Sequence, residues 1–517
     1  MELTQPLHKA LQERPRATAL VCGARRSDFA TFVDRVARLA SVLQSLGLAP
    51  GDRVGMLGLN SDRYVEYLYA TWWAGGVINP VNIRWSPREV AYSLDDCDTR
   101  ILLADGHFGA VAAAQRELST SLKTLVHFGD GPAPEGMHDA EALMAHTAPM
   151  ADARRGGADL AAVMYTGGTT GLPKGVMLSH GNLYVSQLCT NMAAARPDES
   201  VGLNMAPMFH VGGTGLTLQL MMRLCKQVII PAFDELAVLQ ALQAERCSET
   251  FMVPTMLKRL IEHPRFAEFD TSSLQLVLYG AAPIDDALLL QALDKLPQAR
   301  FCQLYGMTEL SPVITALPAW CHASDQPAHR RRSAGRPVPI AQVRIVDAEG
   351  RPVPNGTVGE IAARGPMVMQ GYWNKPGQTA EVLRDGWMHT GDGGRMDDDG
   401  FVYVVDRLKD MVVTGGENVY SAEVENAITQ LPQVSMCAVV GVPDERWGER
   451  VHAVVVLRAG EVLTADDLIA HCRTQIAGYK CPRSVEFVDA IPLSPAGKML
   501  KYKLREAHWA GRERRVG

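Results

Sequence analysis

Apolar residues recur at helical spacing and in short runs, alternately, through the first 280 residues. The segment from Phe29 to Leu46 carries an apolar residue every three or four positions, which predicts a helix with one buried face. The compact apolar run from Arg53 to Leu57 predicts a strand, and the same alternation returns between residues 228 and 279. Strands that alternate with helices indicate parallel sheets covered by helices, so the first part of the chain is predicted to be an α/β domain.

The pattern changes twice further along. From Ser333 to Tyr403, short strand-like runs are interrupted by Gly and Pro, which predicts a small antiparallel sheet or barrel. Beyond Asp406, helical and strand patterns alternate again. A chain of 517 residues is too long for one core. We therefore predict an N-terminal domain over residues 1–406, made of helix-flanked sheets and a barrel-like β subdomain, and a small α+β domain over residues 407–517.

Composition and charge exclude several classes of protein. The residues are 47% hydrophobic and 21% charged, the balance of an ordinary soluble protein. A net charge of −6 provides no general attraction to nucleic acid. The ten cysteines form no C-x-x-C pair, as expected for reduced thiols. The polar N-terminal segment does not resemble a signal peptide, and the apolar runs at residues 67–83 and 201–222 contain Gly and Asn. We expect a cytoplasmic protein without an integral membrane segment.

A Gly- and Thr-rich stretch directly follows the apolar run that ends at Tyr165. Gly lets backbone N–H groups converge on one point, which suits a phosphate oxygen, and the threonine hydroxyls and a lysine add donors. The spacing differs from the G-x-x-x-x-G-K-[ST] phosphate loop. A plain surface loop is the alternative interpretation. The predicted phosphate-binding residues are Thr166, Gly167, Gly168, Thr169, Thr170, Gly171 and Lys174.

A second cluster of chemically distinct residues runs from Gln303 to Glu309. It offers an aromatic ring at Tyr305, a hydroxyl at Thr308 and a carboxylate at Glu309. The ring can stack on a purine, and a carboxylate beside phosphates suits Mg²⁺, which prefers oxygen ligands. We expect Glu309, together with Thr166, to bind Mg²⁺.

Three further residues, Asp392, Arg407 and Lys498, are candidates for the functional site. Asp392 is followed fifteen residues later by Arg407, and the pair could hold the two hydroxyls of a ribose. The alternative is that Asp392 only caps backbone N–H groups in a turn. Lys498 lies on a Gly- and Pro-rich segment, where a lysine alone would be a solvated surface charge.

Together the motifs identify a family resemblance that covers essentially the whole chain. Y-T-G-G-T-T-G-L-P-K-G (165–175), Y-G-M-T-E (305–309), T-G-D (390–392), D-R-x-K-D (406–410) and P-x-S-x-x-G-K (492–498) occur in one order. This set resembles the adenylate-forming superfamily, which comprises acyl- and aryl-CoA ligases, firefly luciferase and the adenylation domains of nonribosomal peptide synthetases. The segment Gly415 to Tyr420 resembles the fatty-acyl-CoA ligases and their relatives.

The resemblance implies a two-step reaction. A carboxylate attacks the α-phosphate of ATP to give acyl-AMP and pyrophosphate, and CoA then displaces AMP. It implies that Lys498 bridges the carboxylate and the α-phosphate. It also implies that Lys409 is the hinge about which the small domain swings. The catalytic residues would be Lys498, Thr166, Lys174, His210 and Glu309. Beyond the phosphate-binding residues, those that contact ATP or CoA would be Gly280, Ala281, Ala282, Pro283, Gln303, Tyr305, Gly306, Met307, Thr308, Asp392, Arg407, Lys409, Gly415, Gly416, Glu417 and Lys498.

The acid would occupy a pocket with small or apolar walls. Its expected residues are His210, Val211, Gly212, Thr214, Gly280, Gly306, Met307, Pro312 and Val313. His210 has a simpler alternative as a core histidine. These segments hold no Arg or Lys that could pair with a second carboxylate, whose unpaired burial would be costly. We therefore expect an apolar monocarboxylate, either a medium-chain fatty acid or an aryl acid.

Other functions remain open at this point. The acceptor thiol could belong to a carrier protein, or oxygen could react as in luciferase. A nucleotide-binding sensor without turnover is the alternative outside enzymes. Related ligases are commonly dimers, so a homodimer is expected by analogy.

Overall fold

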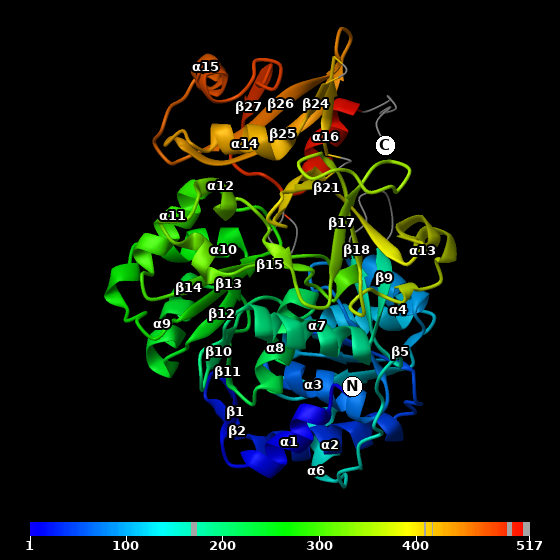
Figure 1. The fold of residues 1–517 in the computed structure, drawn as a ribbon. Coiled ribbons are helices and arrows are strands. Elements are labelled where there is room, and N and C mark those ends of the chain that lie inside the picture. The colour runs from blue at the N-terminus through cyan, green and yellow to red at the C-terminus, as the bar shows by residue number, and fades with distance from the viewer. Residues whose placement is uncertain (167–172, 408–409, 416, 494–498, 510–517) are drawn as a thin grey trace.

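A large domain and a small domain make up the molecule (Figure 1). The computed structural model describes residues 1–166, 173–407, 410–415, 417–493 and 499–509. The small domain, orange and red in Figure 1, lies at one end of the large one. This arrangement confirms the predicted fold class, a large α/β domain followed by a small α+β domain.

The first sheet of the large domain has the order β19-β9-β8-β4-β3-β5-β6-β7. Its strands from β8 through β7 run parallel, and β9 and β19 run antiparallel to their neighbours. The strands are β3 (Arg53–Leu57), β4 (Val77–Pro80), β5 (Thr99–Ala104), β6 (Thr124–His127), β7 (His138–Asp139), β8 (Leu160–Thr166), β9 (Lys174–Ser179) and β19 (Gly371–Tyr372).

The second sheet has the order β16-β15-β14-β13-β12-β10-β11-β1-β2. It is parallel from β14 to β1 and antiparallel at both edges. The strands are β1 (Thr18–Cys22), β2 (Arg25–Asp28), β10 (Val201–Asn204), β11 (Lys226–Ile229), β12 (Glu249–Met252), β13 (Leu276–Gly280), β14 (Arg300–Tyr305), β15 (Thr315–Leu317) and β16 (Arg336–Pro337).

Helices of the large domain begin where the sequence supplies a cap. Ser61 accepts a hydrogen bond from the backbone N–H of Tyr64 at the start of α3, and Ser179 forms a capping box with Asn182 at the start of α7. The helices are α1 (Gln5–Glu13), α2 (Phe29–Ser45), α3 (Asp62–Trp73), α4 (Pro87–Asp96), α5 (Gly109–Leu118), α6 (Ala140–Ala145), α7 (His180–Ala193), α8 (Val211–Met222), α9 (Glu235–Glu245), α10 (Pro254–Ile261), α11 (Asp286–Lys295), α12 (Ala328–Arg331) and α13 (Pro376–Val382).

A small antiparallel sheet occupies the region where one was predicted. Its order is β17-β18-β21-β20, and β22 pairs with β21. Arg407, which the prediction assigned to the second domain, is the last residue of β22 and belongs to this sheet. The strands are β17 (Gln342–Val346), β18 (Gly359–Arg364), β20 (Leu383–Arg384), β21 (Trp387–Met396) and β22 (Val402–Arg407).

The small domain has a sheet and a hydrophobic core of its own. Its sheet has the order β24-β23-β26-β25, with β27 beside β26, and its core includes Val424, Val439 and Leu468. The backbone N–H of Ser421 donates to Asp406 of the large domain at 2.5 Å. The elements are β23 (Val412–Thr414), β24 (Glu417–Val419), α14 (Ser421–Ile428), β25 (Val434–Asp444), β26 (Gly448–Leu457), α15 (Ala465–Gln475), β27 (Ser484–Phe487) and α16 (Lys501–Trp509).

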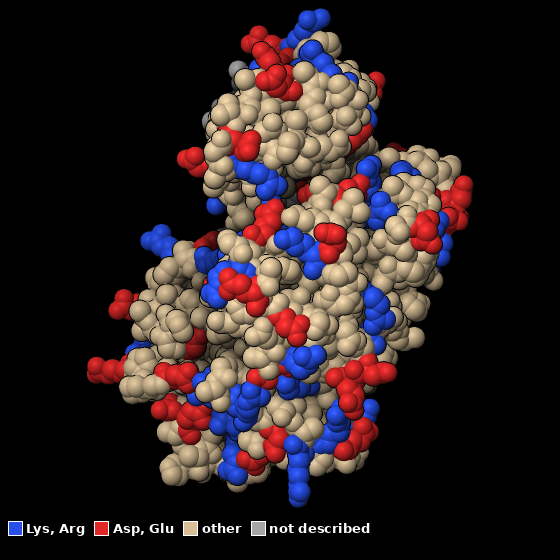
Figure 2. Space-filling model, turned by 90° about the vertical axis from the view of Figure 1, so that its left-hand side faces the viewer, with Lys and Arg blue, Asp and Glu red and all other residues tan. Residues whose placement is uncertain are grey.

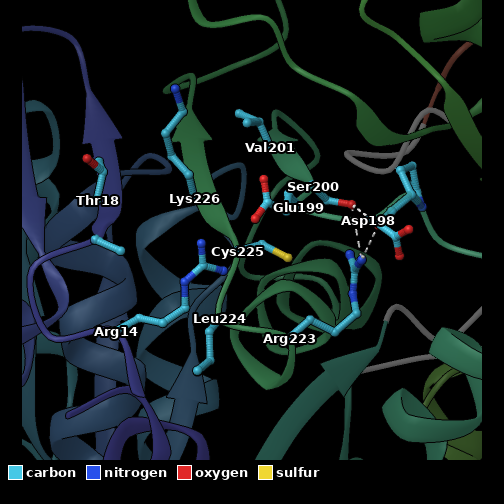
Figure 3. Close-up of a pocket in the computed structure, with 12 residues that line it drawn as sticks. Arg14, Thr18, Asp198, Glu199, Ser200, Val201, Arg223, Leu224, Cys225 and Lys226 are labelled. Atoms are coloured by element: carbon cyan, nitrogen blue, oxygen red, sulfur yellow. Dashed lines mark hydrogen bonds between the residues drawn. The ribbon is translucent and has the colours of Figure 1, made fainter. Parts of the chain in front are cut away.

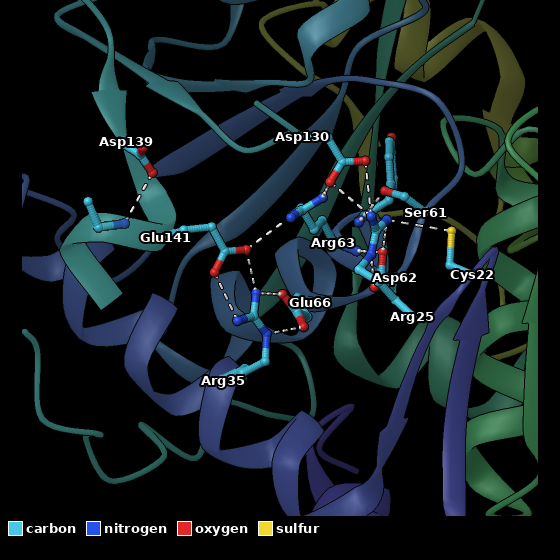
Figure 4. Close-up of polar contacts among 12 residues, drawn as sticks. Cys22, Arg25, Arg35, Ser61, Asp62, Arg63, Glu66, Asp130, Asp139 and Glu141 are labelled. Carbon is cyan, nitrogen blue, oxygen red and sulfur yellow. Dashed lines mark hydrogen bonds and ion pairs between the residues drawn. The ribbon is translucent and has the colours of Figure 1, made fainter. Parts of the chain in front are cut away.

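A network of charges joins α2, α3 and α6 of the large domain (Figure 4). Arg35 donates to Glu66 at 2.6 and 2.9 Å and to Glu141 at 2.8 and 2.9 Å. Arg63 links Glu141 to Asp130 at 3.0 and 2.7 Å. Glu66 is buried, and its pairing with Arg35 offsets part of the cost of desolvating the carboxylate, while burial raises its pKa to about 7. We interpret this network as structural.

The surface carries both signs of charge side by side. On the face shown in Figure 2, Lys and Arg alternate with Asp and Glu over both domains, in keeping with the net charge of −6. Within the described part of the chain, no helix is both long enough and apolar enough to cross a bilayer.

Candidate active site

The Gly-rich stretch connects two antiparallel strands. Thr166 ends β8 and lies opposite Lys174, the first residue of the antiparallel strand β9. Gly167, Gly168, Thr169, Thr170 and Gly171 lie outside the described residues. The amino group of Lys174 lies 5.0 Å from the centre of the Tyr372 ring, within the range of a cation–π contact.

Tyr372 connects that lysine to Glu309. Its hydroxyl donates to Oε1 of Glu309 at 2.8 Å. Glu309 lies in the 3₁₀ turn Thr308–Leu310 and is only 5% exposed. Burial and the charge of Glu309 raise the pKa of Tyr372 well above its ordinary value, so the hydroxyl keeps its proton and orients the carboxylate. Tyr372 is not among the residues predicted from the sequence, because no local pattern links it to a residue 63 positions away.

A second contact joins Tyr305 to Asp392. Tyr305 ends β14, and its hydroxyl donates to Oδ2 of Asp392 at 2.7 Å. Asp392 lies on β21 directly opposite Arg407 of β22. The strand register thus places Asp392 and Arg407 opposite each other across the sheet, and Tyr305 of the second sheet contacts Asp392.

Close backbone packing fixes the turn after Tyr305. A Cβ on Gly306 would lie 1.9 Å from the carbonyl oxygen of Pro312, and one on Gly280 would lie 2.1 Å from that of Leu304. Neither position has room for a side chain. β13 and β14 are adjacent parallel strands, so Gly280 and Tyr305 end at the same edge of the sheet. This carboxyl edge is where ligands bind in open α/β sheets.

The other residues predicted around this edge lie on the segments that flank it. Gln303, on β14, accepts a hydrogen bond of 3.5 Å from the hydroxyl of Tyr279. Met307 and Thr308 lead into the 3₁₀ turn that carries Glu309. Ala281, with φ of 66°, begins the segment after β13 that includes Ala282 and Pro283.

The residues predicted for the acid pocket lie on three segments, of which the first is the end of β13 at Gly280. His210 precedes α8, and its ring packs against that of Phe209 with centroids 4.4 Å apart. Thr214 is buried and donates to the carbonyl of Met208 at 2.6 Å, so its hydroxyl is used inside the helix start. Gly212 approaches the ring of Phe251, where a Cβ would lie 3.3 Å away. The remaining residues, at the start of α8 and after the Tyr305 turn, are Val211, Gly306, Met307, Pro312 and Val313.

The residues predicted to face CoA lie apart from this cluster. Gly415 and Glu417 lie at the β23–β24 hairpin of the small domain. Gly415 has φ of 61° and packs against Trp447, whose ring would lie 2.8 Å from an added Cβ. Lys409, Gly416 and Lys498 lie outside the described residues.

A cavity of about 430 Å³ lies elsewhere in the large domain (Figure 3). Its walls include Arg14, Asp198, Glu199, Arg223 and Lys226. The lining residues at β10 and β11 are at the starts of these parallel strands, the edge opposite to that of Gly280 and Tyr305. Walls with charges of both signs do not suit an apolar acid, so we do not assign this cavity to the substrate.

Family models match both domains. The model described as "AMP-binding enzyme" matches residues 7–373, and that described as "AMP-binding enzyme C-terminal domain" matches residues 423–498. The chain belongs to the AMP-binding enzyme family. The match, together with relatives that are CoA ligases, confirms the resemblance to the adenylate-forming superfamily, in its CoA ligase branch, and the predicted class of acid–thiol ligase.

Relatives of similar length support this assignment. A feruloyl-CoA synthase of an Amycolatopsis species is 41% identical over 497 residues, covering 95% of this chain and 96% of that protein. The fatty acid–[acyl-carrier-protein] ligase ScoC of Streptomyces coeruleorubidus is 35% identical, covering 98% and 96%. The crystal structure of ATP-bound MatB from Rhodopseudomonas palustris is 31% identical, has a TM-score of 0.88, and covers 98% of this chain and 99% of that one.

Proposed function

We propose that this AMP-binding enzyme is an ATP-dependent carboxylate–CoA ligase with an apolar monocarboxylate substrate. The reaction would form acyl-AMP and pyrophosphate, and CoA would then displace AMP to give acyl-CoA. The observation that carries the proposal is the contact between Tyr305 and Asp392 beside Glu309, at the carboxyl edge of the second sheet. A base, a ribose and the phosphates of one nucleotide can be held at that edge by these neighbouring side chains.

In the first step these residues position ATP. Tyr305 would stack on adenine, while Asp392 and Arg407 hold the ribose hydroxyls. Thr308 would contact the α-phosphate, and the hairpin between Thr166 and Lys174 would enclose the β- and γ-phosphates. Catalysis of phosphoryl chemistry rests mainly on positioning and on neutralising charge, which this set of residues can supply.

The carboxylate of Glu309 fits a magnesium ligand. Its oxygens are hard donors, its burial excludes competing water, and the hydrogen bond from Tyr372 fixes its orientation. Glu309, with Thr166, would hold Mg²⁺ near the phosphates. When bound, the ion would neutralise part of their charge.

In the second step the small domain would change its position. Lys498 would bridge the acid and the α-phosphate during adenylation and then withdraw, with Lys409 as the hinge. Gly415, Gly416 and Glu417 would then face CoA. A hinge of this kind absorbs a large change of φ and ψ in a few residues.

The test separates the two half-reactions. ATP–pyrophosphate exchange measures adenylation, and thioester formation from supplied acyl-AMP and CoA measures the second step. Lys498→Ala should abolish exchange and keep most of the thioester step. Equal loss of both steps would contradict the role of Lys498. Exchange without any thioester product would support a nucleotide-dependent function other than CoA ligation.

A panel of acids tests the substrate. We expect aryl and medium-chain fatty acids to support AMP release and dicarboxylates to fail, because residues 210–214 and 306–313 contain no Arg or Lys. The relatives named for feruloyl-CoA and for a fatty acid support this range. A preference for a dicarboxylate would refute it.

A carrier-protein thiol is the second candidate acceptor. The observation in its favour is the 35% identity to a ligase named for an acyl-carrier protein. Competition between CoA and a phosphopantetheinylated carrier protein, with the same acyl-AMP, distinguishes the two acceptors. We expect CoA to react at least tenfold faster.

A further inference from the structure

Three metal-binding side chains meet on the small domain, away from the nucleotide residues. Among the described residues, one group of three His, Cys, Asp or Glu side chains could hold an ion, and it consists of His452, Glu486 and His508. One candidate ligand atom from each lies within 4.8 Å of the others. The residues come from β26, β27 and α16, so the fold and not local sequence brings them together.

His452 is already oriented as a ligand. Its Nδ1 lies 2.8 Å from the Oγ of Ser484, and its side chain is buried. Its Nε2 is buried and has no hydrogen-bond partner among the described residues. Nε2 lies 3.5 Å from Oε2 of Glu486, and the rings of His452 and His508 are 5.0 Å apart between centroids. A histidine that uses one ring nitrogen for a hydrogen bond presents the other to a metal.

We propose that His452, Glu486 and His508 bind a divalent transition-metal ion such as Zn²⁺. Two imidazoles and a carboxylate suit zinc and disfavour Mg²⁺ and Ca²⁺, which prefer oxygen ligands alone. Bonds of about 2.1 Å at tetrahedral angles place ligand atoms roughly 3.4 Å apart. The pair of His452 and Glu486, at 3.5 Å, has nearly this spacing. Glu486 and His508 are exposed and can rotate toward the ion.

The ion would fasten the C-terminal helix to the sheet. His508 lies in the last turn of α16, which begins three residues after Lys498. Arg505 of the same helix is paired with Asp410 at 2.8 Å, and Trp509 donates to the carbonyl of Gly441 at 2.9 Å. A metal bond at His508 adds a further attachment. Three protein ligands leave a coordination position for water, as in exchangeable metal sites and unlike closed structural ones.

The experiment uses the full chain, without a histidine tag and stripped of metal. Zn²⁺ alone is titrated by calorimetry, and Co²⁺ is followed by its visible absorption, which reports tetrahedral nitrogen and oxygen ligands. His508→Ala and Glu486→Gln change exposed side chains and should fold normally. We expect one Zn²⁺ per chain in the parent protein and at least roughly tenfold weaker binding in both variants, since even an indirect change at a metal site costs that much.

Two further variants test the geometry. Ser484→Ala leaves all three ligands in place and removes the hydrogen bond to Nδ1 of His452, so binding should weaken about 10- to 100-fold. His107→Ala is the matched control, because His107 is an exposed histidine that lies 3.7 Å from Asp105. Its binding should equal that of the parent protein.

The outcomes are distinct. Loss of binding in the His508 and Glu486 variants, with His107→Ala unchanged, supports the site. No stoichiometric Zn²⁺ in the parent protein, or equal binding by all variants, overturns it. Adenylation measured without Zn²⁺ should be the same in His508→Ala and the parent protein, so failure of the metal site and failure of the proposed ligase function are separable.

Discussion

A single hydroxyl orients the carboxylate that we assign to magnesium. Tyr372 donates to Glu309 at 2.8 Å, and both side chains are buried. In Tyr372→Phe the carboxylate would lose this donor inside the protein, where a lost hydrogen bond to a charged group costs about 1.5–3 kcal/mol. We expect adenylation to slow by about tenfold or more and to need a higher Mg²⁺ concentration. ATP–pyrophosphate exchange over a Mg²⁺ series measures both effects.

Tyr403→Phe is the matched control for this variant. Tyr403, on β22, also donates to a carboxylate at 2.9 Å, but its partner Asp397 lies in the turn between β21 and β22. Its removal should affect stability without changing the Mg²⁺ dependence. A similar Mg²⁺ response in both variants would show that the Tyr372 contact serves folding alone.

A buried histidine couples the stability of the second sheet to pH. His322 is 6% exposed, its Nε2 lies 2.8 Å from the hydroxyl of Tyr279, and its Nδ1 lies 3.3 Å from the carbonyl of Pro318. Burial lowers the pKa of His322 from 6.5 to about 4. The unfolded chain therefore takes up a proton near pH 6.5, whereas the folded chain takes it up only near pH 4. The contribution of His322 to the free energy of unfolding is fully present above pH 6.5. As pH falls toward 4, this free energy decreases by about 3 kcal/mol.

Substitution of His322 tests the direction of this pH dependence. His322→Asn keeps a polar partner for Tyr279 and removes the titrating ring. The thermal midpoint of the variant should fall less between pH 7 and pH 4.5 than that of the parent protein. Some fall should remain, because burial also lowers the pKa of His180 to about 4. His107→Asn, a surface change, should leave the profile unaltered. An unchanged profile in His322→Asn would contradict the assignment.

At the scale of elements, the pattern of neighbouring residues predicted those helices and strands whose bounds are set by the residues themselves. The helix expected from Phe29 to Leu46 is α2, Phe29–Ser45, because the side chain of Asp28 caps its start and Gly47 follows its end. Asp392 and Arg407 lie opposite each other because β21 and β22 are antiparallel neighbours, and their role at a ribose stays a prediction. No sequence pattern indicated which side chains of distant elements would contact one another. Tyr372 with Glu309 and Tyr279 with His322 depend on how whole sheets pack, so the sequence did not reveal them.

The motifs did not predict two elements that lie beside them, α16 and β9. The segment around Lys498 carries a motif that does not predict α16, whose Lys501 pairs with half-buried Glu425 at 2.7 Å. The Gly-rich motif after β8 likewise does not predict that β9 runs antiparallel to β8. α16 packs against β25, and β9 pairs with β8 and β19, and neither contact is encoded in a Lys-containing or Gly-rich motif.

The turn after β14 should not tolerate a methyl group. In Gly306→Ala the added Cβ would meet the Pro312 carbonyl oxygen at 1.9 Å, so the backbone from Tyr305 to Met307 must move. We expect adenylation to fall at least 100-fold, because even small misplacement of positioning groups is costly. ATP–pyrophosphate exchange and circular dichroism would be measured together. Gly377→Ala is the control, since among the described residues no atom beyond its chain neighbours and its own helix backbone lies within 4 Å of the added Cβ.

The Gly377→Ala variant also shows which result would contradict this prediction. Gly377 is in α13, where alanine should be neutral or slightly stabilising. If Gly306→Ala folds and keeps the exchange rate of Gly377→Ala, the close backbone approach is not needed to hold Tyr305 and Met307.

At the scale of the whole molecule, polar contacts from α10 hold the small domain on the large one. Lys258 donates to the carbonyl of Ser435 at 2.6 Å, and Glu262 lies 3.4 Å from Arg458. Burial lowers the pKa of Lys258. If the small domain changes position between the two half-reactions, these contacts belong to one position and are lost in the other.

Lys258→Ala should therefore act on the two half-reactions unequally. Loss of a partly exposed charged donor is worth about 1 kcal/mol after solvent screening, enough to shift the balance of two positions roughly fivefold. We expect the ratio of adenylation to thioester formation, measured separately, to change at least threefold. Arg259→Ala is the matched control, because Arg259 lies on the same helix and pairs with Glu235 inside the large domain. Equal effects on both half-reactions, or the same ratio in both variants, would show that the contact does not distinguish the two positions.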